Sequence, residues 1–136
     1  MMETPMDRID KILNHDLFLY HLGRNNAAEA DRRFCRHSMV HFLDVARIGT
    51  IIALEEGFKI DREWIYAAAL LHDCGKHEQY ENGIPHEQAS ARIAPEILKT
   101  CGFDDEETGV IVTAISRHRD PEVAKEKNLN GILYRA

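Results

Sequence analysis

The chain has 136 residues, enough for one domain with its own hydrophobic core, so we expect a single domain over residues 1–136. Hydrophobic residues make up 44% and charged residues 29% of the sequence, a composition that excludes a disordered or fibrous chain. The formal net charge is -6 and no block of Lys and Arg stands out, which argues against binding of a nucleic acid polymer.

Three cysteines, Cys35, Cys74 and Cys101, lie far apart and show no CxxC spacing. Separated cysteines in an odd number indicate reduced thiols, so we expect a cytoplasmic protein. Residues 1–7 hold no apolar core of a signal peptide, and no later run reaches membrane-spanning length. The sequence therefore predicts no membrane association.

Apolar residues recur at helical spacing, and β-branched alternation never persists over a strand's length, which predicts an all-α fold. Thr4 and Pro5 form a cap and first-turn pair for a short first helix. A second helix is predicted from Asn14. A third, long helix is predicted at about residues 36–56, with Gly57 as its left-handed stop.

The predicted third helix carries an apolar stripe that includes Val45, Ile48 and Ile52. His41 falls on the same stripe, so we expect its side chain to face the core. His37 lies one turn earlier on that face. The two histidines form an HxxxH pair, a spacing that can bind zinc by itself.

Asp61 is predicted to cap a fourth helix that ends near Gly75. Residues 77–85 are rich in Gln, Asn and Gly, which predicts a loop at the rim of a site. A helix is then predicted over residues 85–101. Pro95 should kink or split it, because proline removes one donor and crowds the preceding turn.

Two cap signals organise the C-terminal part of the chain. Asp104 and Glu107 have the spacing of a capping box, which predicts a helix that delivers His118. Asp120 and Pro121 are typical of a cap and first helical position, and they predict a final element that continues nearly to the end of the sequence.

The segment from Ala67 to Lys76 reads Ala-Ala-Ala-Leu-Leu-His-Asp-Cys-Gly-Lys, an apolar helical run that ends in His72 and Asp73. Its small and aliphatic residues can pack on all sides, so both polar side chains should reach the interior. A buried imidazole beside a buried carboxylate is costly without a partner. A metal ion held by nitrogen and oxygen ligands would satisfy both groups.

Three further histidines fall at predicted helix ends or on inward faces: His41, His86 and His118. A single inward histidine is more often a core or capping residue than a ligand. Together with His72 and Asp73, however, these residues predict a metal centre.

The run Ala-Leu-Leu-His-Asp-Cys-Gly-Lys, with His41 upstream at the head of Val-Ala-Arg, resembles the HD domain superfamily of metal-dependent phosphohydrolases. His86 in His-Glu-Gln-Ala-Ser-Ala and His118 in Ser-Arg-His-Arg resemble the additional ligand histidines of its two-metal members. The resemblance extends from about Phe34 to the C-terminus. It implies a helical bundle of five or more helices.

The resemblance also implies roles for particular residues. His41, His72 and Asp73 would be metal ligands, with Asp73 bridging two ions, while His86 and His118 would hold the second ion. Lys76 would face the substrate phosphate. Histidine-rich ligation favours two divalent transition metal ions such as Fe, Mn, Co, Ni or Zn over Mg.

The function implied by the resemblance is hydrolysis of a small phosphate ester or nucleotide, with a metal-bridged hydroxide attacking phosphorus. Catalysis would then rest on Asp73 and Lys76. One alternative is a mixed-valent di-iron oxygenase, because some HD proteins use the same ligand pattern for oxygen chemistry. Another is a non-catalytic regulatory domain that binds a metal or a nucleotide.

The sequence departs from the family at one position. Family members add a further aspartate ligand soon after an apolar segment like the last five residues here, and the sequence stops at Ala136. We therefore expect the HD domain to be incomplete at the C-terminus. Asp120 could substitute, although its place before Pro121 favours a helix cap.

Overall fold

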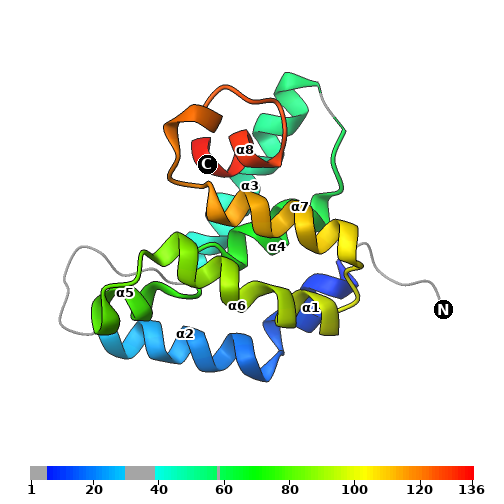
Figure 1. Ribbon diagram of the computed structural model, residues 1–136. Helices are drawn as coiled ribbons and strands as arrows, with labels where there is room; N and C mark the ends of the chain where they lie inside the picture. The colour runs from blue at the N-terminus through cyan, green and yellow to red at the C-terminus, as the bar shows by residue number, and fades with distance from the viewer. Residues whose placement is uncertain (1–5, 30–38, 58) are drawn as a thin grey trace.

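The computed structural model describes residues 6–29, 39–57 and 59–136, and within these ranges every regular element is a helix (Figure 1). The predicted all-α class is confirmed. No helix among the described residues is long and apolar enough to cross a membrane. The elements are α1 (Asp7–Leu13), α2 (Asp16–Glu29), α3 (Met39–Glu56), α4 (Arg62–Leu71), α5 (Lys76–Asn82), α6 (His86–Thr100), α7 (Asp105–Ser116), the 3-10 turn η1 (Pro121–Val123) and α8 (Leu129–Arg135).

Helix α4 is the core helix of the bundle, and it packs against α1, α3, α6, α7 and α8. Its segment 67–71 is fully buried, as expected for a helix that is apolar on all sides. The predicted cap at Asp61 is present, because its side chain accepts a hydrogen bond from the Glu63 backbone N–H at 2.9 Å. The helix therefore delivers its C-terminal end into the interior.

Helix α3 buries only part of the predicted apolar stripe. Val45 is buried and Ile52 packs against the core, but Ile48 is 46% exposed, and Ala46, Gly49 and Ala53 are buried beside Val45. The reason is close helix packing: a Cβ at Gly49 would lie 2.9 Å from a methyl group of Ile132 in α8. Small residues thus face the neighbouring helices, and several large aliphatic residues of α3 face outward.

The prediction of a loop over residues 77–85 is wrong, because α5 occupies most of this segment. The helix ends at Gly83, which has the left-handed φ of 70° that glycine tolerates. Its inward residue is His77, which is 2% exposed and hydrogen-bonds His21 of α2 at 2.8 Å. Helix α5 therefore packs through polar contacts such as His77 with His21, and it lacks the apolar stripe from which a helix is predicted in a sequence.

The predicted caps at Asp104 and Asp120 are present, although the element that follows Asp120 differs from the prediction. Asp104 and Glu107 form the predicted capping box, and α6 continues through Pro95 without being split. Asp120 caps η1 through the Glu122 backbone N–H, but the predicted single final element consists of η1 and a separate helix α8. The predicted helix starts at residues 4–5 and 36–38 lie outside the described residues, as do Cys35 and His37.

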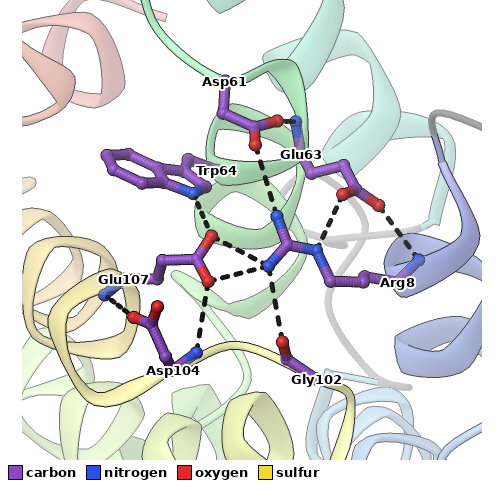
Figure 2. A network of polar contacts seen from close by, with 7 residues as sticks. All are labelled: Arg8, Asp61, Glu63, Trp64, Gly102, Asp104 and Glu107. Atoms are coloured by element: carbon purple, nitrogen blue, oxygen red, sulfur yellow. Dashed lines mark hydrogen bonds and ion pairs between the residues drawn. The ribbon is translucent and has the colours of Figure 1, made fainter.

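A polar network ties α1 to α4 and α7 (Figure 2). Arg8 Nε donates to Glu63 Oε1 at 2.7 Å, and its Nη1 donates to both carboxylate oxygens of Glu107 at 2.8 and 2.9 Å. Asp61 accepts from Arg8 Nη2 at 3.3 Å, and Trp64 Nε1 donates to Glu107 at 2.7 Å. One cation thus serves three carboxylates from two other helices, a self-contained structural cluster.

Candidate metal centre

The predicted ligands lie where four helices meet. His41 is near the start of α3, His72 caps the C-terminal end of α4 and Asp73 follows it. His86 is the first residue of α6, and His118 comes just after α7. Helix ends leave backbone groups unpaired, so they offer both side chains and polar backbone atoms to a shared site.

The side chains form two groups that share Asp73. In the first, the ligand atoms of His41, His72 and Asp73 all lie within 4.8 Å of one another, and Asp73, His86 and His118 form the second in the same way. Asp73 Oδ2 is 3.3 Å from His72 Nε2, whereas Asp73 Oδ1 is 3.4 Å from His86 Nε2 and 3.7 Å from His118 Nε2. The two carboxylate oxygens therefore face different groups, the geometry that a bridging ligand needs.

Hydrogen bonds fix which ring nitrogen of two histidines carries the proton. His72 Nδ1 lies 2.5 Å from the Ala69 carbonyl oxygen, and His118 Nδ1 lies 2.6 Å from the Ile115 carbonyl oxygen. A carbonyl oxygen only accepts, so each Nδ1 must donate. The Nε2 atom of each ring therefore carries a lone pair, and this lone pair faces the carboxylate of Asp73. Metal-ligating imidazoles have the same arrangement.

Gln79 of α5 fixes His86 in the same tautomer. Its Oε1 accepts from the His86 backbone N–H at 3.1 Å and from His86 Nδ1 at 2.8 Å. Because a backbone N–H requires an acceptor, the amide orientation is determined, and His86 Nε2 is left with a lone pair. This Nε2 faces His118 Nε2 at 3.2 Å with no proton to share between them. Such a donor set fits a cation and suits a divalent transition metal.

Electrostatics keep these imidazoles neutral. Burial lowers the pKa of His86 to about 4, with the charges of Lys76 and His118 acting in the same direction and Asp73 opposing them. Burial also lowers the pKa of His118, and the charge of His72 adds to this effect. A histidine must be neutral to bind a metal, so both rings are prepared for ligation at neutral pH.

The turn that carries Asp73 is held from both sides by polar side chains that sequence patterns did not identify. Asn25 of α2 is fully buried; its Nδ2 donates to the Asp73 carbonyl at 2.9 Å, and its Oδ1 accepts from the His77 N–H at 2.8 Å. Ser90 Oγ of α6 accepts from the Gly75 N–H at 2.9 Å. A Cβ at Gly75 would lie 2.6 Å from the Ser90 nitrogen, so only glycine allows this approach.

The remaining predicted residues lie around the centre. Lys76 is half-buried at the start of α5, with Nζ 5.9 Å from the Tyr80 ring, and its charge reaches His86. Asp120 belongs to neither ligand group and instead pairs with Arg117 at 3.0 Å, which agrees with its interpretation as a cap. His41 is exposed, so the expectation that it faces the core is wrong, although its ring lies 6.4 Å from that of His72.

Comparisons with known proteins agree with this geometry. The profile of the HD domain family matches residues 39–136. A protein of Clostridium beijerinckii (strain ATCC 51743 / NCIMB 8052), described only as uncharacterized, is 47% identical over 131 residues, which is 96% of this chain and 82% of that protein. No solved structure matches the chain. The family match spans most of the chain and includes every residue of both ligand groups, so the chain belongs to the HD domain family, whose members bind divalent metals and are generally metal-dependent hydrolases.

Proposed function

We propose that this protein is a metal-dependent phosphohydrolase that acts on a small phosphate ester such as a nucleotide. The observation that carries the proposal is the position of Asp73, whose two oxygens face two different groups of imidazole nitrogens. A shared carboxylate of this kind suits two neighbouring ions better than one, because it offsets the charge of both.

The residues fit the proposed ions as two sets. His41, His72 and Asp73 would hold one ion, and Asp73, His86 and His118 would hold the other. Divalent ions bound here would lower the pKa of water from about 16 to about 7 and so supply a nucleophile at neutral pH. The contribution of the protein is to orient His72, His86 and His118 through the contacts of their Nδ1 atoms, while burial lowers the pKa of His86 and of His118.

Lys76 is the proposed phosphate-binding residue. It lies three positions after Asp73, at the start of α5, and its charge acts on His86. An ammonium group at this place would pair with a phosphate oxygen and offset charge that develops during phosphoryl transfer. Lys76 is thus expected to act on the substrate rather than on the metals.

The test is to purify the protein without chelator or affinity nickel, measure its metal content, and assay phosphate release from nucleotides and phosphomonoesters. We expect two divalent ions per chain and metal-dependent release of phosphate. Lys76→Met should keep the metals but lose at least about tenfold in kcat/KM, as expected when one buried or half-buried charge contact to phosphate is removed. The matched control is Lys125→Met, at an exposed position outside both ligand groups.

Other outcomes would point to other members of the same superfamily. Bound iron with oxygen consumption and no phosphate release would indicate a di-iron oxygenase. Tight nucleotide or metal binding without turnover would indicate a regulatory domain. Either result would contradict the proposed hydrolysis while leaving the metal centre intact.

A further inference from the structure

The two ligand groups bring few negative charges to the ions that they are proposed to hold. Within the described residues their one carboxylate is that of Asp73, and the other members are imidazoles: His41, His72, His86 and His118. One carboxylate offsets only part of the charge of two divalent cations, and uncompensated charge is costly away from bulk water. A further anion beside the centre would therefore strengthen ion binding.

Glu87 has a carboxylate oxygen that the fold buries without a hydrogen-bond donor. It is the second residue of α6 and follows His86 directly. Its Oε2 atom is shielded from solvent and has no hydrogen-bond partner in the part of the chain that the structure describes. Burial of a carboxylate oxygen without a donor is costly. A positive charge nearby would offset that cost.

The position of this oxygen relates it to the second ligand group. Glu87 Oε2 lies 3.7 Å from His86 Nδ1, which is too long for a hydrogen bond, and Nδ1 donates to Gln79 instead. The carboxylate therefore acts on the ring by its charge. Burial lowers the pKa of both His86 and His118, and the charge of Glu87 opposes this effect at both rings. The same field favours a cation bound by these rings.

We propose that Glu87 is the second anion of the metal centre, and that it strengthens binding of the ion in the second ligand group (Asp73, His86 and His118) without being a ligand. The proposal rests on the two-ion centre of the proposed function, but not on phosphate hydrolysis. Glu87 belongs to neither ligand group, so its effect is exerted through space. Because the attraction between charges falls with distance, the ion of the first group should gain less.

The position of Glu87 in the first turn of α6 also allows a purely structural role. A carboxylate there interacts favourably with the N-terminal end of the helix dipole. Such a role would stabilise the metal-free chain and would not distinguish between the two ions. Asp120, a carboxylate close to His118 in the sequence, pairs with Arg117 at 3.0 Å and is thus already compensated. The difference between the two ions is therefore the measurement that separates the two roles of Glu87.

Calorimetric titration of the metal-free full chain with Mn²⁺ tests the proposal. Glu87→Gln keeps the shape of the side chain and an acceptor oxygen but removes the charge. We expect this variant to bind one ion about tenfold more weakly and the other ion within about threefold of the original chain. Glu96→Gln is the matched control, because Glu96 is an exposed glutamate later in the same helix. Both ions should bind to it as they bind to the original chain.

His118→Ala assigns the effect to one ion. This variant removes a ligand of the second group and leaves the first group complete. Addition of Glu87→Gln to it should leave the affinity for the remaining ion unchanged within about threefold. A further loss of affinity in this double variant, or equal weakening of both ions in Glu87→Gln alone, would show that Glu87 does not act on one ion and would overturn the proposal.

Thermal unfolding of the metal-free chain tests the structural role. If Glu87→Gln lowers the midpoint of unfolding but binds both ions as the original chain does, Glu87 supports only helix α6 and the proposal is wrong. A chain that binds no Mn²⁺ would contradict the two-ion centre and this role of Glu87 with it. Selective weakening of one ion in a chain that releases no phosphate would support this role while contradicting the proposed hydrolysis.

Discussion

Two polar clusters in this molecule are built in opposite ways. In the Arg8 network a cation lies among three carboxylates, and donors and acceptors match within the cluster (Figure 2). In the candidate metal centre, imidazole nitrogens without protons face a carboxylate and one another, as the 3.2 Å contact of His86 with His118 shows. The first cluster supplies its own positive charge and stabilises the fold. The second has lone pairs that could bind a cation from outside the chain.

The largest expected effect is that of Asp73→Ala. Removal of the shared carboxylate takes one anionic ligand from both ion positions at once, so the protein should lose both ions and its metal-dependent activity. Elemental analysis of protein purified without chelator measures this. Asp120→Ala is the control, because Asp120 caps η1 and lies in neither ligand group. Full metal content in Asp73→Ala would show that Asp73 does not bridge.

Arg8→Met should show the opposite behaviour and destabilise the fold while leaving metal binding unchanged. The variant removes the cation that pairs with Glu63 and Glu107, at side chains only 12% and 17% exposed. We expect the free energy of unfolding to fall by about 3 kcal/mol, measured by urea denaturation of the metal-free chain. Arg24→Met breaks an exposed pair with Glu81 and should lower the free energy of unfolding much less, because solvent screens an exposed ion pair. An equal decrease in the free energy of unfolding in both variants would mean that the Arg8 network stabilises the fold no more than an exposed ion pair does.

Gln79→Leu tests whether the metal centre depends on residues that never touch the ion. Without the Gln79 acceptor, His86 can rotate or take the other tautomer, so one ion should bind about tenfold more weakly. Metal titration by calorimetry should therefore resolve one weakened site and one unchanged site. Gln88→Leu, at an exposed position of α6, provides the matched control. Unchanged affinity in Gln79→Leu would show that the tautomer is set by other contacts.

The smallest effects are in the pH dependence of stability, which should separate the two clusters. The pKa of His86 is lowered to about 4 in the folded chain from an ordinary value of 6.5, so the unfolded state binds more protons between these values. Stability of the metal-free chain should therefore fall as the pH drops from about 6.5 to 4. Burial raises the pKa of Glu107, but hydrogen bonds from Trp64 and Arg8 outweigh this effect, and the pKa is lowered. The stability that Glu107 contributes is therefore present above its ordinary pKa of 4.5 and is lost only below that value.

Urea denaturation across this pH range would check both windows. His86→Gln should reduce the slope above about pH 4.5, where Glu107 does not yet titrate, and leave the part that comes from the lowered pKa values of His118 and His21. Glu107→Gln should reduce the slope below that value. A His86→Gln variant with an unchanged slope above pH 4.5 would show that its imidazole is not held neutral by the fold.

Local signals in the sequence were sufficient for much of the fold. The caps at Asp61 and Asp104 and the apolar run before His72 each involve residues within a few positions of one another, so their effect does not depend on the rest of the chain. The family motif gave the five proposed ligands in the same way. The motif implied that these residues lie close together, but only the tertiary structure shows that they form two groups that share Asp73.

What the sequence by itself determined was thus the helical class, most helix starts and ends, and the residues with metal-binding chemistry. The tertiary structure alone decided that α5 is a helix, that α3 turns Gly49 inward and Ile48 outward, and that Gln79 supports His86. Each of these features depends on a partner in another helix: α2 for the polar face of α5, α8 for the close approach at Gly49, and α6 for Gln79. Periodicity within one segment carries no information about which neighbour will cover it, because burial is a property of the packed helices and not of one helix.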